Sequence, residues 1–133
     1  MIMDYTFFML PLSIMEKSEK GSDAGGNFIR YNGTTIYRMH LVGSVAAMDI
    51  NEESESGYLI LDDTFSSVLV HFQRSFFSLF KNINRGDFVE VLGTLNFYND
   101  STTLQLNNIK KIDMKRYMYN KIESIKNLKR IEG

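Results

Sequence analysis

The sequence predicts an all-β fold, a five-stranded Greek-key barrel with appended helices, the longer of which is a C-terminal α-helix. Short segments of alternating apolar and polar residues, separated by Gly, Asn, Asp and Ser, indicate strands joined by turns. Helical spacing of apolar residues is confined to one short internal segment and to the C-terminal tail. A chain of 133 residues is long enough for one core and too short for two ordinary domains.

The expected strands follow one another along most of the chain. The first, over 35–50, is interrupted at Gly43, where a residue without Cβ lets a strand bend from one side of a barrel to the other. The later expected strands are 58–62, 68–72, 87–98 and 102–112. The last two form a hairpin with a tight polar loop at Asn99 to Ser101.

Two segments have the spacing of amphipathic helices. Residues 73–83 place apolar side chains three or four positions apart, and Gly86 then supplies the left-handed geometry that ends such a turn. The tail over 113–133 opens with Asp113 as the expected N-cap. Its broad apolar face carries Met114, Met118, Ile122, Ile125 and Leu128.

These patterns divide the chain into three parts. Residues 1–27 are expected to hold an apolar N-terminal segment and a Gly-rich linker, because 16–27 is polar and lacks a hydrophobic period. The barrel is expected over 28–112 and the helix over 113–133. The apolar segment from Tyr5 to Leu12 is expected to dock on the barrel or on a partner, since it would be prone to aggregate if exposed.

The net charge of -1 conceals an acidic body and a basic tail. Residues 1–108 carry 7 Lys and Arg against 13 Asp and Glu, whereas residues 109–133 carry 8 against 3. Attraction of nucleic-acid phosphates must therefore be local and modest. The N-terminal segment contains Asp4 and Pro11 and has no basic residue before Glu16. It fits neither a secretory signal nor a membrane span, so an intracellular protein is expected.

The residues give no sign of catalysis, of a metal or of a cofactor. The sequence has no Cys and only two histidines, His40 and His71, without the spacing of a metal site. Asp62 and Asp63 are adjacent on an expected strand and would point to opposite faces, so we expect them to cap a turn. Neither a Gly-rich phosphate loop nor a nucleophile elbow is present.

The order of strand, bent strand, strand, short helix and two more strands is that of an OB-fold. Residues 27–45 resemble the entry into the barrel of archaeal replication protein A-like proteins. Residues 59–64, 68–70 and 86–95 resemble the second, third and fourth strands of the middle subunit of replication protein A and of the related telomere-capping Stn1 subunit. The resemblance covers 27–131, and it is to a minimal, archaeal-type form, because no sequence remains for a phosphorylatable tail or a winged helix. The sequence also lacks the Trp that the family often stacks on a base.

The resemblance implies binding of single-stranded DNA across the second and third barrel strands, between two loops. Tyr98 aligns best with the stacking aromatic of the last loop, and Phe72 lies nearest the position of the missing Trp. The acidic loop over 51–57 would repel phosphates there. Each aromatic has an alternative role in the core. The predicted nucleic-acid-binding residues are Arg38, Tyr58, His71, Phe72, Arg74, Phe97, Tyr98 and Asn99.

The resemblance also implies partners. The C-terminal helix would bind a larger subunit with several OB-folds and a small third subunit, although it could instead fold back on its own barrel. The resulting hypothesis is a single-stranded DNA-binding subunit of a heteromeric complex in DNA replication or repair. The alternatives are an assembly subunit with little DNA contact and an RNA-binding module. The expected location is the cytoplasm or nucleoid in an archaeon and the nucleus in a eukaryote.

Overall fold

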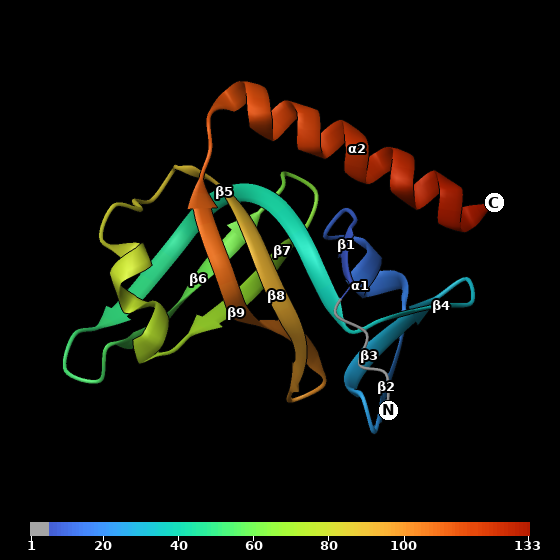
Figure 1. Cartoon of the computed structure of the whole chain (residues 1–133), viewed down its shortest axis with the longest axis horizontal. Coiled ribbons are helices and arrows are strands. Elements are labelled where there is room, and N and C mark those ends of the chain that lie inside the picture. Colours follow the sequence, from blue (N-terminus) through green and yellow to red (C-terminus); the bar gives the residue numbers. More distant parts are fainter. Residues whose placement is uncertain (1–5) are drawn as a thin grey trace.

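A closed five-stranded barrel forms the centre of the protein in the computed structural model, which describes residues 6–133 (Figure 1). Its strands are β5 (Arg38–Asn51), β6 (Ser56–Asp62), β7 (Ser67–Phe72), β8 (Phe88–Tyr98) and β9 (Ser101–Lys111). They pair in the order β5-β6-β7-β9-β8, and β8 pairs back to β5 to close the barrel. β7 and β9 run parallel, whereas the other barrel pairs are antiparallel. The prediction of a five-stranded barrel with a C-terminal helix is confirmed.

Side-chain alternation along the barrel strands separates an apolar interior from an outer face. On β6, for example, Leu59 and Leu61 are fully buried while Tyr58 and Ile60 are partly exposed. The equivalent inward positions on other strands include Val70, Val91 and Leu104. Burial of these aliphatic side chains contributes most of the driving force for folding.

The long strand β5 closes the barrel by pairing with two neighbours. Its first half pairs with β8 and its second half with β6, and the register shifts between Val45 and Ala47. Gly43 precedes this corner, and a Cβ there would lie 2.7 Å from the carbonyl oxygen of Asp62. The glycine therefore permits the close approach of two backbones that the bend requires. The strand begins at Arg38 rather than at residue 35.

A 3₁₀ helix, η1 (Arg74–Phe80), connects β7 to β8. Of the apolar residues with helical spacing, Phe80 and Ile83 are buried against the barrel, whereas Leu79 is 40% exposed. The segment has 3₁₀ rather than α-helical geometry, which is frequent in segments that connect other elements. Gly86 has the predicted left-handed conformation, with φ of 92°.

The N-terminal segment docks on the barrel. Strand β1 (Phe7–Met9) runs parallel to the start of β5, and a short helix, α1 (Ile14–Lys17), follows it. Leu10, Leu12 and Ile14 are buried in the main core. The part of the predicted segment at Tyr5 lies outside the described residues.

The predicted linker over 16–27 is wrong, because most of it forms a second sheet. This sheet consists of β2 (Glu19–Asp23), β3 (Gly26–Tyr31) and β4 (Thr34–Ile36), so residues 28–36 also lie outside the barrel. Asp23 makes the β2–β3 turn by accepting a hydrogen bond from Gly25 N at 2.8 Å. Four of the five residues of β2 are exposed, so the strand lacks the alternation by which a strand is detected.

Helix α2 (Met114–Glu132) runs from the end of β9 across the barrel toward the second sheet (Figure 1). The carboxylate of Asp113 accepts a hydrogen bond from Arg116 N at 2.8 Å, which confirms the predicted N-cap. At the far end, the hydroxyl of Tyr31 donates to Glu132 at 2.9 Å. The helix therefore folds back on its own chain along its whole length.

Candidate nucleic-acid interface

The β8–β9 hairpin ends in a two-residue turn. Asn99 and Asp100 both have positive φ, 48° and 66°, as a type I′ hairpin turn requires. The short polar side chains of Asn and Asp tolerate this conformation better than most. The tight turn leaves Tyr98 at the tip of the hairpin, with 66% of its surface exposed.

A groove of about 580 Å³ separates this tip from the outer face of β6 and β7. Ile60 and Leu69, which are register partners, line it on the two neighbouring strands. Tyr98 and Asn99 line it from the hairpin. The other lining residues come from the N-terminal segment, β2, β7 and β9: Leu12, Met15, Glu16, Lys20, Ser67, Val68, Ser101, Thr102 and Thr103. The groove thus combines an apolar surface with an exposed aromatic ring.

Lys20 is a basic residue of this site that sequence reasoning missed. Its ammonium group donates a hydrogen bond to the carbonyl oxygen of Asp100 and lies 5.9 Å from the centre of the Phe97 ring. Strand β2 thereby reaches the hairpin tip and adds a basic group to the groove. Nothing in the polar 16–27 segment could have indicated this, because the contact joins residues 80 positions apart.

Four of the predicted binding residues lie on or near the groove. Tyr98 and Asn99 line it directly. Tyr58 and His71 are register partners on β6 and β7, one step along the same outer face from Ile60 and Leu69. A single strand of nucleic acid crossing β6 and β7 could therefore contact all four.

The structure corrects the prediction for Phe72. Only 2% of this residue is exposed, and its ring stacks on that of Phe80 at a centroid distance of 3.7 Å. Residue 72 faces inward because it has the same parity on β7 as the buried Val68 and Val70. Phe72 is therefore a core residue and no platform for a base. Phe97 is also partly buried and packs against the main core.

Arg38 and Arg74 lie away from the groove. Arg38 stands at the start of β5 opposite Thr94 of β8, and by strand alternation it shares its outer face with His40. Arg74 opens η1 and lies 4.0 Å from Glu55. The predicted basic residues are thus spread over different faces of the barrel.

The acidic β5–β6 loop lines a different groove. Glu52 and Glu55 border a hollow of about 690 Å³ beside η1, whose lining shares no residue with the groove at Tyr98. The carboxylates of this loop therefore do not line the Tyr98 groove. The charged residues that line that groove are Lys20 and Glu16.

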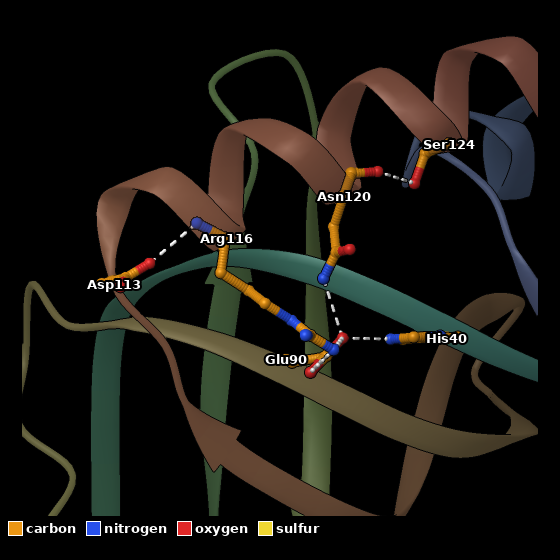
Figure 2. Close-up of polar contacts among 6 residues, drawn as sticks. All are labelled: His40, Glu90, Asp113, Arg116, Asn120 and Ser124. Atoms are coloured by element: carbon orange, nitrogen blue, oxygen red, sulfur yellow. Dashed lines mark hydrogen bonds and ion pairs between the residues drawn. The ribbon is translucent and has the colours of Figure 1, made fainter.

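A polar cluster seats α2 on the barrel (Figure 2). Glu90 of β8 accepts hydrogen bonds from His40 Nε2 and Asn120 Nδ2, both at 2.8 Å, and forms an ion pair with Arg116 at 3.3 Å. Burial raises the pKa of the Glu90 carboxyl, but the hydrogen bond and charge of His40, together with Arg116, outweigh burial and hold this pKa below its usual value. Glu90 is therefore a carboxylate that anchors the helix.

The contact of α2 with the barrel leaves an apolar stripe of this helix exposed to solvent. Residues Asn120 and Ser124 are buried against the barrel, and Tyr117 stacks on Phe88 at 4.5 Å. Leu128 packs against the main core, unlike the other residues of the predicted partner-binding face. Those that remain 43–55% exposed are Met114, Met118, Ile122 and Ile125. The helix folds back on its own barrel and still presents an unpaired apolar surface.

Among residues 6–133 no three or more His, Cys, Asp and Glu side chains gather as they would around a metal ion. In the same range, no helix is both long and apolar enough to cross a membrane. Asp62 and Asp63 accept hydrogen bonds from the backbone of the β6–β7 loop, as expected for turn-capping residues.

The topology of the five-stranded barrel, with a connecting helix between β7 and β8, defines an OB-fold, to which α2 is appended. A search of protein-family models finds no match to the chain, and a search of curated protein sequences finds none either. Among solved structures, a chain of the Stn1–Ten1 complex of S. pombe matches with a TM-score of 0.80 and 20% identity, over 95% of this chain and 93% of that one. A chain of a replication protein A heterotrimer bound to single-stranded DNA matches with a TM-score of 0.78 and 16% identity, over 95% of this chain and 98% of that one.

The extent of these matches separates them from OB-folds in general. Asparaginyl-tRNA synthetase from Pyrococcus horikoshii matches with a TM-score of 0.50 and 15% identity, over only 57% of this chain and 20% of that one. Each of the two matches leaves 5% of this chain uncovered, which is fewer residues than the 19 of α2. Their likeness therefore includes part of the C-terminal helix. The predicted resemblance to subunits of replication protein A and Stn1–Ten1 complexes is confirmed at the level of the fold.

Proposed function

We propose that this protein is a single-stranded DNA-binding OB-fold subunit of a heteromeric complex of the replication protein A or Stn1–Ten1 type. The observation that carries the DNA-binding part is the groove between the β6–β7 face and the exposed ring of Tyr98. The setting we propose is DNA replication, repair or chromosome-end capping inside the cell. The protein is proposed to act without catalysis and without a cofactor.

Binding would rest mainly on stacking. An exposed Tyr98 ring offers a face on which any base can stack, worth about 1–3 kcal/mol without sequence preference. Tyr58 and His71 would continue the contact along the strand, and Lys20 would supply a phosphate partner. Because one Lys and one Glu line the groove, electrostatic attraction is weak and the affinity of this subunit alone is modest.

That same charge balance favours a second candidate. An assembly subunit would keep the barrel as a scaffold for α2 and contact DNA little. In both cases the exposed stripe of α2 would bind partner subunits, which we propose to be a larger subunit with several OB-folds and a small third subunit. The two candidates differ in whether the Tyr98 groove contributes to DNA affinity.

Replacement of Tyr98 by alanine distinguishes them. We expect Tyr98→Ala to weaken binding of a fluorescently labelled oligo-dT by about 10-fold at low salt, because one stacked base is lost. The matched control is Tyr119→Ala, since Tyr119 is 63% exposed but lies on α2 away from the groove. Equal affinities of the wild-type and Tyr98→Ala chains, or equal losses for both tyrosines, would favour the assembly role.

The assembly role has its own test at Ile122. An aspartate at this exposed position should leave the chain folded but remove native partner subunits that co-purify with the tagged protein, because a charge in an apolar helix contact is left unpaired. The control is Leu79→Asp, which places the same charge at another partly exposed apolar position, on η1. Partners that remain bound to Ile122→Asp at wild-type levels would exclude the stripe as their binding surface.

A further inference from the structure

A second groove adjoins the one at Tyr98. It is apolar, has a volume of about 190 Å³ and lies between the segment Leu10 to Ser13, the β6–β7 loop and α2. Leu12 lines both grooves, so they meet at this side chain. The chain that enters β7 borders both as well, with Ser67 in the Tyr98 groove and Phe65 in the second one. A ligand that leaves the Tyr98 groove past Ser67 therefore reaches the second groove.

Phe65 presents its ring at this junction, with 82% of its surface exposed. It is two residues from Ser67, so the Cα atoms of the two residues lie within about 7 Å of each other. The loop that carries the ring is held from inside, because the buried carboxylate of Asp63 accepts hydrogen bonds from the backbone nitrogens of Phe65 and Ser66. An exposed ring on an anchored loop can stack on a base without the cost of ordering the loop.

A cation stands beside this ring. The ammonium group of Lys121 lies 5.3 Å from the centre of the Phe65 ring and donates a hydrogen bond to the carbonyl oxygen of Asp63 at 3.1 Å. An ammonium group has three N–H donors, so two remain for a phosphate. The nearby carboxylates of Asp62 and Asp63 are directed at the backbone nitrogens of their own loop. Lys121 is therefore available as a phosphate partner.

The arrangement at Phe65 repeats that at the hairpin tip. There, Lys20 lies 5.9 Å from the centre of the Phe97 ring, next to the exposed ring of Tyr98. At the other end of the two grooves, Lys121 stands beside the exposed ring of Phe65. Each end thus offers a ring for a base and a lysine for a phosphate, the combination that suits a single strand of nucleic acid. Continuity with the Tyr98 groove favours the same strand as the occupant of both ends.

We infer that Phe65 and Lys121 form a second contact for single-stranded DNA. The strand continues from the Tyr98 groove past Ser67, stacks a base on Phe65 and places a phosphate beside Lys121. This inference rests on the DNA-binding part of the proposed function and extends its site beyond the barrel face. Because Phe65 lies outside the Tyr98 groove, only strands long enough to reach it make the contact.

A length series of fluorescently labelled oligo-dT tests this inference with the full-length chain at low salt. Lengths from about 4 to about 16 nucleotides span the site sizes of OB-folds. For the longest strand, Phe65→Ala should weaken binding by about 10-fold, because one stacked base is lost. For the shortest strand, which fits within the Tyr98 groove, the same variant should bind as the wild type does. Tyr98→Ala should weaken binding at every length, and the control Tyr119→Ala, at an exposed ring on α2, at none.

The salt dependence of binding gives Lys121 a separate readout. With the longest strand, Lys121→Gln should make the slope of log affinity against log salt concentration shallower by about 0.7, because one phosphate contact of a single strand is lost. Lys121→Arg keeps the positive charge and should retain the wild-type slope. With the shortest strand, neither variant should change the slope.

The outcomes separate the inference from the proposed function. An unchanged affinity of Phe65→Ala for the longest strand, or an equal loss at every length, would overturn the inference. If Phe65→Ala binds DNA normally but loses co-purifying partner subunits, the ring is a protein contact and the inference is wrong. A loss in Tyr98→Ala without one in Phe65→Ala removes the second contact and leaves the proposed DNA-binding function standing. If Tyr98→Ala binds every length as the wild type does, the proposed DNA-binding function itself fails.

Discussion

Replacing Gly57 with alanine is expected to destabilise the protein by about 3 kcal/mol, the upper part of the range for steric overpacking in a core. An alanine Cβ at this position would lie 2.1 Å from the carbonyl oxygen of Asp49 and 3.0 Å from the Phe72 ring. The first obstacle is backbone of the neighbouring strand β5, so no side-chain rotation relieves it. To make room for the Cβ, β5 and β6 would have to move apart next to the loop that joins them, where Gly57 pairs with Ile50.

The shift of the urea midpoint, followed by circular dichroism, measures this cost. The matched control is Gly33→Ala, because the same Cβ at Gly33 has open space around it but meets a positive φ of 82°. That control should lose only about 1 kcal/mol, from backbone strain alone. A Gly57→Ala midpoint equal to or above that of Gly33→Ala would show that β6 yields easily and that the close strand approach is unimportant.

Loss of the Glu90 carboxylate is the second change with a large expected effect. Glu90→Ala leaves His40 and Asn120 without their shared acceptor and removes the ion pair with Arg116, so we expect a loss of about 2 kcal/mol. Most of this loss should appear as weaker attachment of α2 to the barrel. Faster amide hydrogen exchange in α2 than in the barrel strands would show that the cluster holds the helix down. Replacing Glu123, which pairs with Lys126 on the same helix, is the control and should cost little.

The lowered pKa of Glu90 makes this contribution depend on pH. Since the pKa is lower in the folded than in the unfolded state, the carboxylate stabilises the protein fully above the usual Glu value of about 4.3. That stabilisation is lost as the pH falls through the lower, folded-state value. Urea midpoints are measured at a series of pH values from about pH 6 downward. With falling pH, the midpoint should decrease less steeply for Glu90→Gln than for the wild type. Parallel curves would contradict the role of this carboxylate.

Side-chain periodicity was enough to predict most of the barrel. Alternation along β6, β7 and β8 identifies strands with one buried face, and Asn99 and Asp100 identify a hairpin turn. Phe72 shows the limit of this reasoning, because an aromatic residue on a strand can stack on a base or fill the core. Its parity with Val68 and Val70 on β7 would have favoured the core.

The binding groove was only half predictable. Tyr98 and Asn99 are local to one hairpin, so their exposure follows from the turn. Lys20 lies on β2, and no hydrophobic pattern in the sequence predicts this strand, because β2 is exposed on both faces. The residues by which α2 contacts the barrel were missed for a related reason. In the sequence Asn120 and Ser124 are polar residues typical of an exposed helix face, and only the fold buries them, with Asn120 donating a hydrogen bond to Glu90.

The sequence by itself determined the order of the five barrel strands along the chain, the glycine at the corner of β5, the capped C-terminal helix and its apolar stripe. These features depend on local conformational preference and on the period of neighbouring side chains. Only the tertiary structure decided that α2 lies on the barrel through Asn120 and Ser124 as well as Tyr117 and Leu128, and leaves Met114, Met118, Ile122 and Ile125 in solvent. That choice depends on Glu90 and His40, which are far from the helix in sequence, and a hydrogen-bonded cluster between distant elements leaves no periodic signal.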